Sequence, residues 1–271
     1  MKNKLSFTLA GLVLLFSILA CNVTIDNDWG NNDETVRGSG KVIEEARTVS
    51  NVSGVELTMQ GTLYITMGDK ESLRIEAEDN LLEYIQTDVS MGRLVIKSRQ
   101  GINLRNAQPI KYYLTVTELN SLVVSSSGDI ETKDLKSDSF SITISSSGNV
   151  SIDGLDCTSL RVRISSSGNV DISELAADSI SVDISSSGNL DIQKGKVQKQ
   201  DINISSSGEY RASEVESVSA DVVLTSSGEA TIRVSDQLTG RLSSSGNINY
   251  IGNPDVNVNM TSSGRTVKIG E

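Results

Sequence analysis

Apolar and polar residues alternate in the second half of the chain, and the alternation returns every twenty residues. Phe140, Ile142 and Ile144 are separated by polar residues, and equivalent apolar triplets lie at 160–164 and 180–184. Successive side chains of a β-strand point to opposite faces, so a period of two predicts strands with one buried face. The regular return of the pattern predicts that each unit is built in the same way.

A four-residue motif, Ser-Ser-Ser-Gly or Thr-Ser-Ser-Gly, separates these strands. Its spacings along the chain are 20, 20, 20, 20, 20, 18 and 18 residues. The motif glycines are Gly128, Gly148, Gly168, Gly188, Gly208, Gly228, Gly246 and Gly264. The alternation places each of them on the inner face, at a corner that leaves room only for small residues and favours unusual dihedral angles. We therefore expect each unit to be one coil of a β-solenoid, with coils stacked ~4.8 Å apart.

The residue after each motif is predicted to face outward, and it is polar in every coil. These residues are Asp129, Asn149, Asn169, Asn189, Glu209, Glu229, Asn247 and Arg265. One interpretation is solubility and turn chemistry at a stacked corner. The other is a repetitive polar surface that holds a glycan or another repetitive ligand. We favour the first, because Asn and Ser are ordinary residues of stacked corners.

The first half of the chain alternates in the same way but less regularly. Apolar residues occupy every second position from Val55 to Met59, and the alternation resumes at Leu63 and Ile65 beyond Gly61. Further short strands are predicted near residues 73–77, 85–89, 94–96 and 112–116, with a turn or a single helical turn at 79–83. We expect irregular coils over residues 41–124 that continue into the regular repeats of 125–271 and cap their N-terminal end.

The N-terminus has the features of an export signal. Lys2 and Lys4 precede an apolar run from Leu5 to Ala20, which is shorter than the ~20 residues of a spanning helix. The run ends in Ile-Leu-Ala-Cys21, which resembles the lipobox of bacterial lipoproteins. The resemblance implies cleavage before Cys21 and a diacylglycerol on its thiol; an ordinary signal peptide with an incidental Cys is the alternative. We predict a lipoprotein signal peptide over 1–20 and a flexible acidic tether over 21–40.

Composition excludes several classes of function. The 271 residues include no His, which excludes Ser-His-Asp and Cys-His catalysis within the chain. The net charge is -11, and it becomes -13 without residues 1–20, which carry two Lys and no acid. Such an acidic chain is poorly suited to bind nucleic acid or to dock on anionic lipid by charge.

Few residues are candidates for a chemical site. Asp171 and Asp191 are predicted at the same outward position of neighbouring coils, where they could hold a cation such as Ca²⁺. The alternative, which we favour, is two solvated carboxylates that repel each other, and we predict no metal, no cofactor and no catalytic residue. Cys157 falls in a predicted turn and is expected to be an unreactive thiol, since no His is present to activate it.

The pattern as a whole resembles a known family. The run LTMQGTLYITMGDKESLRIEAEDNLLEYIQTDVSMGRLVIKS, followed by repeats of Ser-Ser-Ser-Gly-Asn/Asp-Val/Ile, resembles the putative auto-transporter adhesin family with a head GIN domain. This family is common in Bacteroidetes, often on lipoproteins, and the resemblance covers about residues 41–265. It implies an all-β fold, a right-handed parallel β-helix or β-solenoid with about 20, later 18, residues per coil. It also implies a role in cell adhesion, without the catalytic residues of pectin-lyase-like folds.

The sequence therefore predicts a lipid-anchored β-solenoid of the outer membrane, on the cell surface or on the periplasmic face. Its expected partners are the membrane, through the anchor, and a glycan or a surface protein. The alternatives are a periplasmic scaffold and, less favoured, a polysaccharide-active enzyme on the same fold. We expect a monomer, although the chain ends soon after Gly264 and leaves an incomplete last coil with an open strand edge.

Overall fold

The computed structural model describes residues 33–271, and Glu34–Glu271 form one compact unit of β-strands. The predicted signal peptide, Cys21 and most of the predicted tether lie outside the described residues. The end of the predicted tether is not a spacer, because β1 (Glu34–Arg37) pairs in parallel with β8 (Ile102–Arg105). The folded unit thus begins at Glu34 rather than at residue 41. Within residues 33–271, no helix combines the length and the apolar character needed to cross a membrane.

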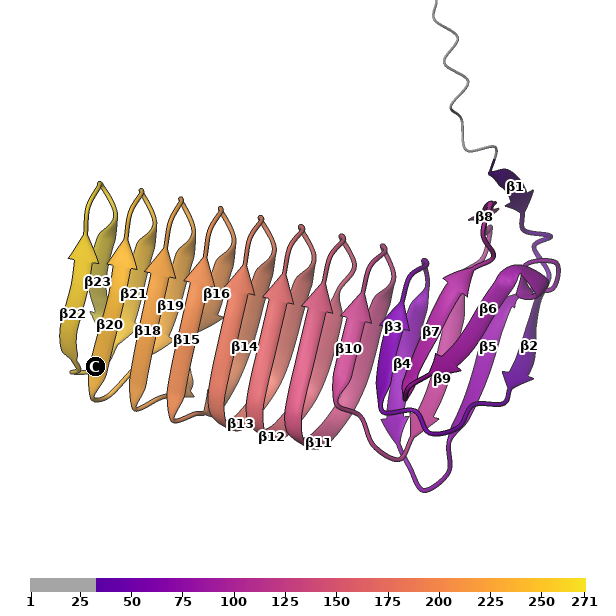
Figure 1. Ribbon diagram of the computed structural model, residues 1–271, viewed down its shortest axis with the longest axis horizontal. Coiled ribbons are helices and arrows are strands. Elements are labelled where there is room, and N and C mark those ends of the chain that lie inside the picture. The colour runs from indigo at the N-terminus through magenta and orange to yellow at the C-terminus, as the bar shows by residue number, and fades with distance from the viewer. Residues whose placement is uncertain (1–32) are drawn as a thin grey trace, which may run out of the picture. The chain divides into compact units, whose positions relative to one another are not determined.

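Residues 121–270 form a stack of coils, each contributing one strand to each of two facing layers (Figure 1). The stack begins with β10 (Ser121–Val124), β11 (Asp129–Ile144), β12 (Val150–Ile164) and β13 (Asn169–Ile184). It continues with β14 (Asn189–Lys196), β15 (Lys199–Ile204), β16 (Glu209–Ala212), β17 (Val215–Glu216), β18 (Ser219–Leu224), β19 (Glu229–Arg233), β20 (Gln237–Leu242), β21 (Asn247–Ile251), β22 (Asp255–Met260) and β23 (Arg265–Gly270). Strands β11, β12 and β13 bend through the corner opposite the Ser-Ser-Ser-Gly motif without a break, whereas later coils divide there into shorter strands.

Neighbouring strands of this stack are parallel and in the register that the repeat predicts, except for a one-residue shift after Tyr250 where β21 pairs with β23. Ile142 pairs with Val162 and Val162 with Val182, so equivalent residues of the repeat stack directly on one another. Between β18 and β20, Ala220 pairs with Leu238, which is the shorter step of 18 residues. These registers confirm the predicted β-solenoid and its change of coil length.

The alternating apolar residues fill the space between the two layers. Ile142, Val162 and Val182 are at most 1% exposed, and the equivalent Leu122, Ile202 and Val222 are fully buried. Full burial of one such side chain contributes ~1.5–3 kcal/mol relative to leaving it in water. The core is therefore a continuous row of short aliphatic side chains along the solenoid axis.

The motif glycines lie where each coil closely approaches the previous one. A Cβ on Gly148 would lie 2.1 Å from the carbonyl oxygen of Gly128 and 2.6 Å from a methyl group of Val124. None of the motif glycines has φ in the left-handed region, so the expectation of unusual dihedral angles is wrong. The close approach of the preceding backbone, rather than backbone conformation, excludes a side chain here.

The N-terminal part stacks on the solenoid in an order that differs from the chain order. Strands β3 (Gly54–Leu57) and β4 (Thr62–Met67) form a coil against β10 and β11. On its other side this coil pairs with β7 (Arg93–Ser98) and β9 (Lys111–Val116), which occur later in the chain. All four strands are parallel to the repeat, so they extend the solenoid as predicted.

Antiparallel strands close this end of the stack (Figure 1). Strand β6 (Ile85–Ser90) pairs antiparallel with β7, β5 (Ser72–Glu78) with β9, and β2 (Val42–Arg47) with β5. A single 3₁₀ turn, η1 (Leu82–Tyr84), connects β5 and β6. The expectation of coils throughout residues 41–124 is therefore wrong for β2, β5 and β6. The chain reverses direction before β5 and before β7, so these strands pair antiparallel and form a cap.

Candidate functional site

The two carboxylates singled out in the sequence lie side by side on the outer face. Asp171 on β13 and Asp191 on β14 are register partners, and the guanidinium of Arg211 on β16 lies 3.8 Å from Asp191. Burial and the charge of Asp191 raise the pKa of Asp171, and Arg211 partly offsets this effect. Within residues 33–271, no group of three or more His, Cys, Asp or Glu side chains is placed to hold a metal ion. This arrangement favours a surface row of charges over a cation site.

The polar residues after the first motifs form a ladder of amide hydrogen bonds. The Asn149 side-chain amide donates to Asp129 Oδ1 at 2.8 Å, and Asn169 donates to Asn149 Oδ1 at 2.9 Å. Asn189 repeats the contact with Asn169 Oδ1, also at 2.9 Å. Because these amides are half-buried and bond to one another, they stabilise the corner and are poorly available to a ligand.

Cys157 lies within strand β12 rather than in the predicted turn, because the strand continues through this corner, and only 6% of its surface is exposed. Burial, with a smaller contribution from Asp156, raises the pKa of its thiol to about 11. The thiolate is the reactive form of cysteine, so this thiol is almost entirely protonated and unreactive near neutral pH.

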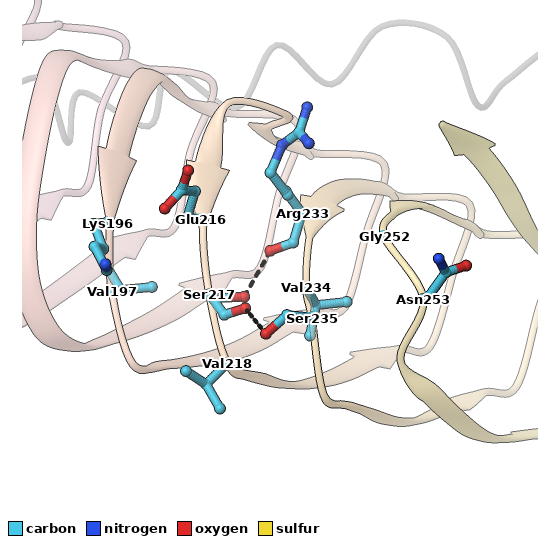
Figure 2. A pocket seen from close by; sticks show the side chains of 10 residues that line it. All are labelled: Lys196, Val197, Glu216, Ser217, Val218, Arg233, Val234, Ser235, Gly252 and Asn253. Atoms are coloured by element: carbon cyan, nitrogen blue, oxygen red, sulfur yellow. Dashed lines mark hydrogen bonds between the residues drawn. The ribbon is translucent and has the colours of Figure 1, made fainter. Parts of the chain in front are cut away.

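A groove of about 450 Å³ lies at the corner opposite the motif, where the coils shorten (Figure 2). Its lining residues are Lys196, Val197, Glu216, Ser217, Val218, Arg233, Val234, Ser235, Gly252 and Asn253. Figure 2 shows Ser217 joined to Arg233 and Ser235 by hydrogen bonds, from Ser217 Oγ to Arg233 O at 2.6 Å and from Ser235 Oγ to Ser217 O at 3.2 Å. The shorter coils leave a step in the surface, and the groove occupies that step.

A buried polar cluster supports this groove from within the core. The Tyr210 hydroxyl donates to Gln200 Oε1 at 2.8 Å, and the Gln200 amide donates to Ser217 Oγ at 2.9 Å. Gln200 is fully buried and Ser217 is 5% exposed. Burial raises the pKa of Tyr210, so the phenol stays protonated and continues to donate. The cluster therefore holds the irregular corner together and supplies no group for chemistry.

The outer face of the N-terminal coils carries a stack of aromatic and cationic side chains, here called the tyrosine stack. It consists of Arg74 on β5, Tyr113 on β9 and Tyr64 on β4, which are neighbours in register. The two rings lie 5.4 Å apart at an interplanar angle of 20°, and the Arg74 guanidinium lies 4.1 Å from the centre of the Tyr113 ring. The Tyr113 hydroxyl donates to Glu76 at 3.3 Å.

A hollow of about 140 Å³ adjoins the tyrosine stack. Its lining residues are Tyr64, Ile65, Thr66, Glu131, Thr132, Lys133, Ser151 and Asp153. Sequence reasoning missed this feature. The available signal was that Tyr64 and Tyr113 occupy outward positions of their strands, between buried apolar residues. Their proximity depends on a register between strands 49 residues apart, which the repeat does not reveal.

Comparisons with known proteins point to one family. The sequence profile described as "Putative auto-transporter adhesin, head GIN domain" matches residues 51–173 and 158–254. A search of curated proteins found no match.

Three solved structures from Parabacteroides and Bacteroides species share this fold. A putative lipid binding protein from Parabacteroides distasonis is 25% identical, with a TM-score of 0.82 over 87% of this chain and 100% of the other. A putative adhesin from Parabacteroides merdae is 21% identical, with a TM-score of 0.81 over 87% and 99%. A putative adhesin from Bacteroides fragilis is 22% identical, with a TM-score of 0.65 over 86% and 100%.

Proposed function

Because the chain belongs to the putative auto-transporter adhesin, head GIN domain family, we propose that it is a lipid-anchored binding protein of the cell envelope. It acts by adhesion rather than by catalysis. The diacylglycerol on Cys21 holds it to the outer membrane, and the solenoid binds a glycan or a protein on a facing surface.

The observation that carries this proposal is the continuous stack of parallel strands that runs from β7 and β9, through β3 and β4, to β22 and β23. Its parallel layers present rows of equivalent side chains at regular intervals, as repeat proteins do on the extended surfaces with which they bind partners. The polar side chains described above are bonded to one another or lie in shallow surface features. Such a surface suits recognition of an extended partner better than turnover of a small substrate.

The charge of the chain supports anchoring by lipid rather than by electrostatic attraction. At -13 after loss of residues 1–20, the protein is repelled by an anionic membrane surface. Each buried methylene of an acyl chain contributes about 0.8 kcal/mol of membrane affinity, so two chains on one Cys provide a stable anchor. Cys21 follows directly on the apolar run, where the attachment is expected.

The test is protease treatment of intact cells that express the chain with a C-terminal epitope tag in Parabacteroides, the genus of two of the relatives. Loss of the tag without lysis supports a surface adhesin. Protection until the outer membrane is permeabilised contradicts it and favours a periplasmic scaffold. Cys21→Ala is the control for the anchor: it should release the protein from the membrane fraction, and continued attachment would contradict lipidation at Cys21.

A further inference from the structure

We propose that the hollow beside Tyr64 binds one pyranose ring of a neutral glycan, with the open face of Tyr64 as its stacking surface. This inference rests on the proposed adhesive function and names the chemical class of one ligand. It concerns a site on the outer face of β4, β11 and β12, away from the groove shown in Figure 2.

The tyrosine stack leaves one aromatic face without a stacking partner. Arg74 and Tyr64 are the register neighbours of Tyr113 on its two sides, so both faces of that ring are occupied. On its other side, Tyr64 has Glu131 of β11 as its register partner, and the hollow opens there. The stack therefore ends in an aromatic wall, to which a flat, partly apolar ring can add.

Hydrogen-bonding groups surround the remaining sides of the hollow. Glu131 and Ser151 line it, and so do Lys133 and Asp153, which form an ion pair with 2.8 Å between Nζ and Oδ2. A pyranose has one apolar C–H face and a girdle of hydroxyl groups. An aromatic wall with carboxylates, a hydroxyl and an ammonium around it is complementary to both features. The short side chain of Ser151 leaves the space open.

A buried hydroxyl without a partner lies beneath the hollow, on the inner face of β11. Thr132 lines the hollow and is 6% exposed, and its Oγ1 is the one buried side-chain oxygen or nitrogen within residues 33–271 that lacks a hydrogen-bond partner. Equivalent positions in the next coils are Ile152 and Ile172, which need no partner. Thr132 also pairs with the buried Ile65, so its side chain lies on the core side of the sheet and its hydroxyl is out of reach of a ligand in the outer hollow.

The charge and the volume of the hollow restrict the class of ligand further. Glu131 and Asp153 place negative charge at the hollow, and the whole chain is strongly acidic. Uronic acids, sialic acids and phosphorylated sugars are therefore disfavoured, and neutral hexose units are favoured. A hollow of about 140 Å³ accommodates a single ring, so a longer glycan is held at one residue while its remainder extends over the surface.

The alternative role for the tyrosine stack is purely structural, as a cross-strand contact that supports the antiparallel cap. The variants separate the two roles. Tyr64→Ala removes the wall, Tyr64→Phe keeps it, and Ser151→Leu fills the hollow without touching the stack. Tyr84→Ala is the matched control, because Tyr84 is likewise a half-buried tyrosine whose ring packs against a neighbouring side chain, with Arg99 4.4 Å from its ring centre, but it does not line the hollow.

The experiment is isothermal titration of the full chain, purified in a zwitterionic detergent without sugar groups. The probes are mannohexaose, maltohexaose, galactohexaose and, as the acidic comparison, hexagalacturonate. We expect one of the neutral probes to bind and the acidic probe not to bind. Tyr64→Ala and Ser151→Leu should each weaken binding at least tenfold, whereas Tyr64→Phe and Tyr84→Ala should bind within about twofold of the unchanged chain.

Three results would overturn the inference. They are no binding of any neutral probe, tighter binding of hexagalacturonate, or neutral-glycan binding that Tyr64→Ala and Ser151→Leu leave intact. Thermal unfolding of each variant shows whether a loss of binding reflects a loss of fold, and Ser151→Leu decides the matter if Tyr64→Ala unfolds. Protease treatment of intact cells tests the proposed function independently of glycan binding. If the chain is exposed on the cell surface but binds no neutral glycan, this inference is wrong and the proposed function still stands.

Discussion

Replacing one motif glycine with alanine is a sharp test of how the coils stack. In Gly168→Ala, the new Cβ lies 2.2 Å from the Gly148 carbonyl oxygen and 2.6 Å from a methyl group of Ile144. The nearest atom belongs to the backbone of the preceding coil, so no side-chain rotation relieves the clash. The two coils must move apart locally, and their hydrogen bonds must lengthen.

The clash lowers the free energy of unfolding. Overpacking a well-filled interior costs ~1–3 kcal/mol, and this contact lies at the upper end because backbone must move. We therefore expect a loss of about 3 kcal/mol, which corresponds to a fall in the unfolding temperature of roughly 6–12 °C for a domain of this size. Because repeat proteins derive their stability from contacts between neighbouring units, the weakened junction also reduces cooperativity between the two parts of the stack.

Urea and thermal unfolding followed by far-ultraviolet circular dichroism measure this loss. Gly154→Ala is the matched control in the preceding coil, since its Cβ would meet only the end of the Asp134 side chain, a carboxylate oxygen 2.5 Å away that can rotate aside. The control should change stability by less than about 0.5 kcal/mol. If Gly168→Ala were no less stable than Gly154→Ala, close packing of the backbone would not be the reason for glycine at this corner.

Three further predictions concern single side chains. Tyr210→Phe leaves the buried Gln200 Oε1 without its donor and should cost ~1–3 kcal/mol in urea unfolding, more than Tyr112→Phe, whose hydroxyl makes only a 3.3 Å contact. The pKa of Asp171 is raised in the folded protein, so ionisation of this carboxyl lowers the free energy of unfolding. Asp171→Asn should therefore stabilise the protein at pH 7 by less than about 0.5 kcal/mol, and the gain should vanish below about pH 3.9, where the carboxyl is protonated in both states. The Cys157 thiol should resist a thiol reagent at pH 7.5 in the folded protein and react promptly in urea; rapid reaction in the folded protein would contradict its burial.

The solenoid itself was predictable because its signals are local. The alternation through Ile142 and Val162 assigns each side chain to a face, and equal spacing of the motif sets which residues stack. The reason for the motif glycines was only half predictable. The sequence correctly predicted that these corners leave no room for a side chain. It wrongly predicted unusual dihedral angles, because what excludes a side chain is the carbonyl oxygen of the preceding coil.

The candidate sites were predicted less well, because they arise where the repeat breaks down. Tyr64 and Tyr113 meet because β9 returns beside β4, and no pattern in the sequence indicates that return. The groove forms where the coils lose residues at one corner, and the spacing of the motif shows only that the coils become shorter. Asp171 and Asp191 lie side by side as the equal spacing predicts, and Arg211 of the next coil lies beside Asp191, in line with the expectation that it offsets local acids.

The sequence alone determined the coil, its period, its buried face and the polar rows that cover it. These properties follow from side-chain alternation within a strand and from equal chain lengths between corners, both of which are local. Only the tertiary structure decided the order of the N-terminal strands, the antiparallel cap and the hollow beside Tyr64. Those features depend on which distant segments close against each other, and that choice is made by the packing of the whole unit rather than by any one stretch of chain.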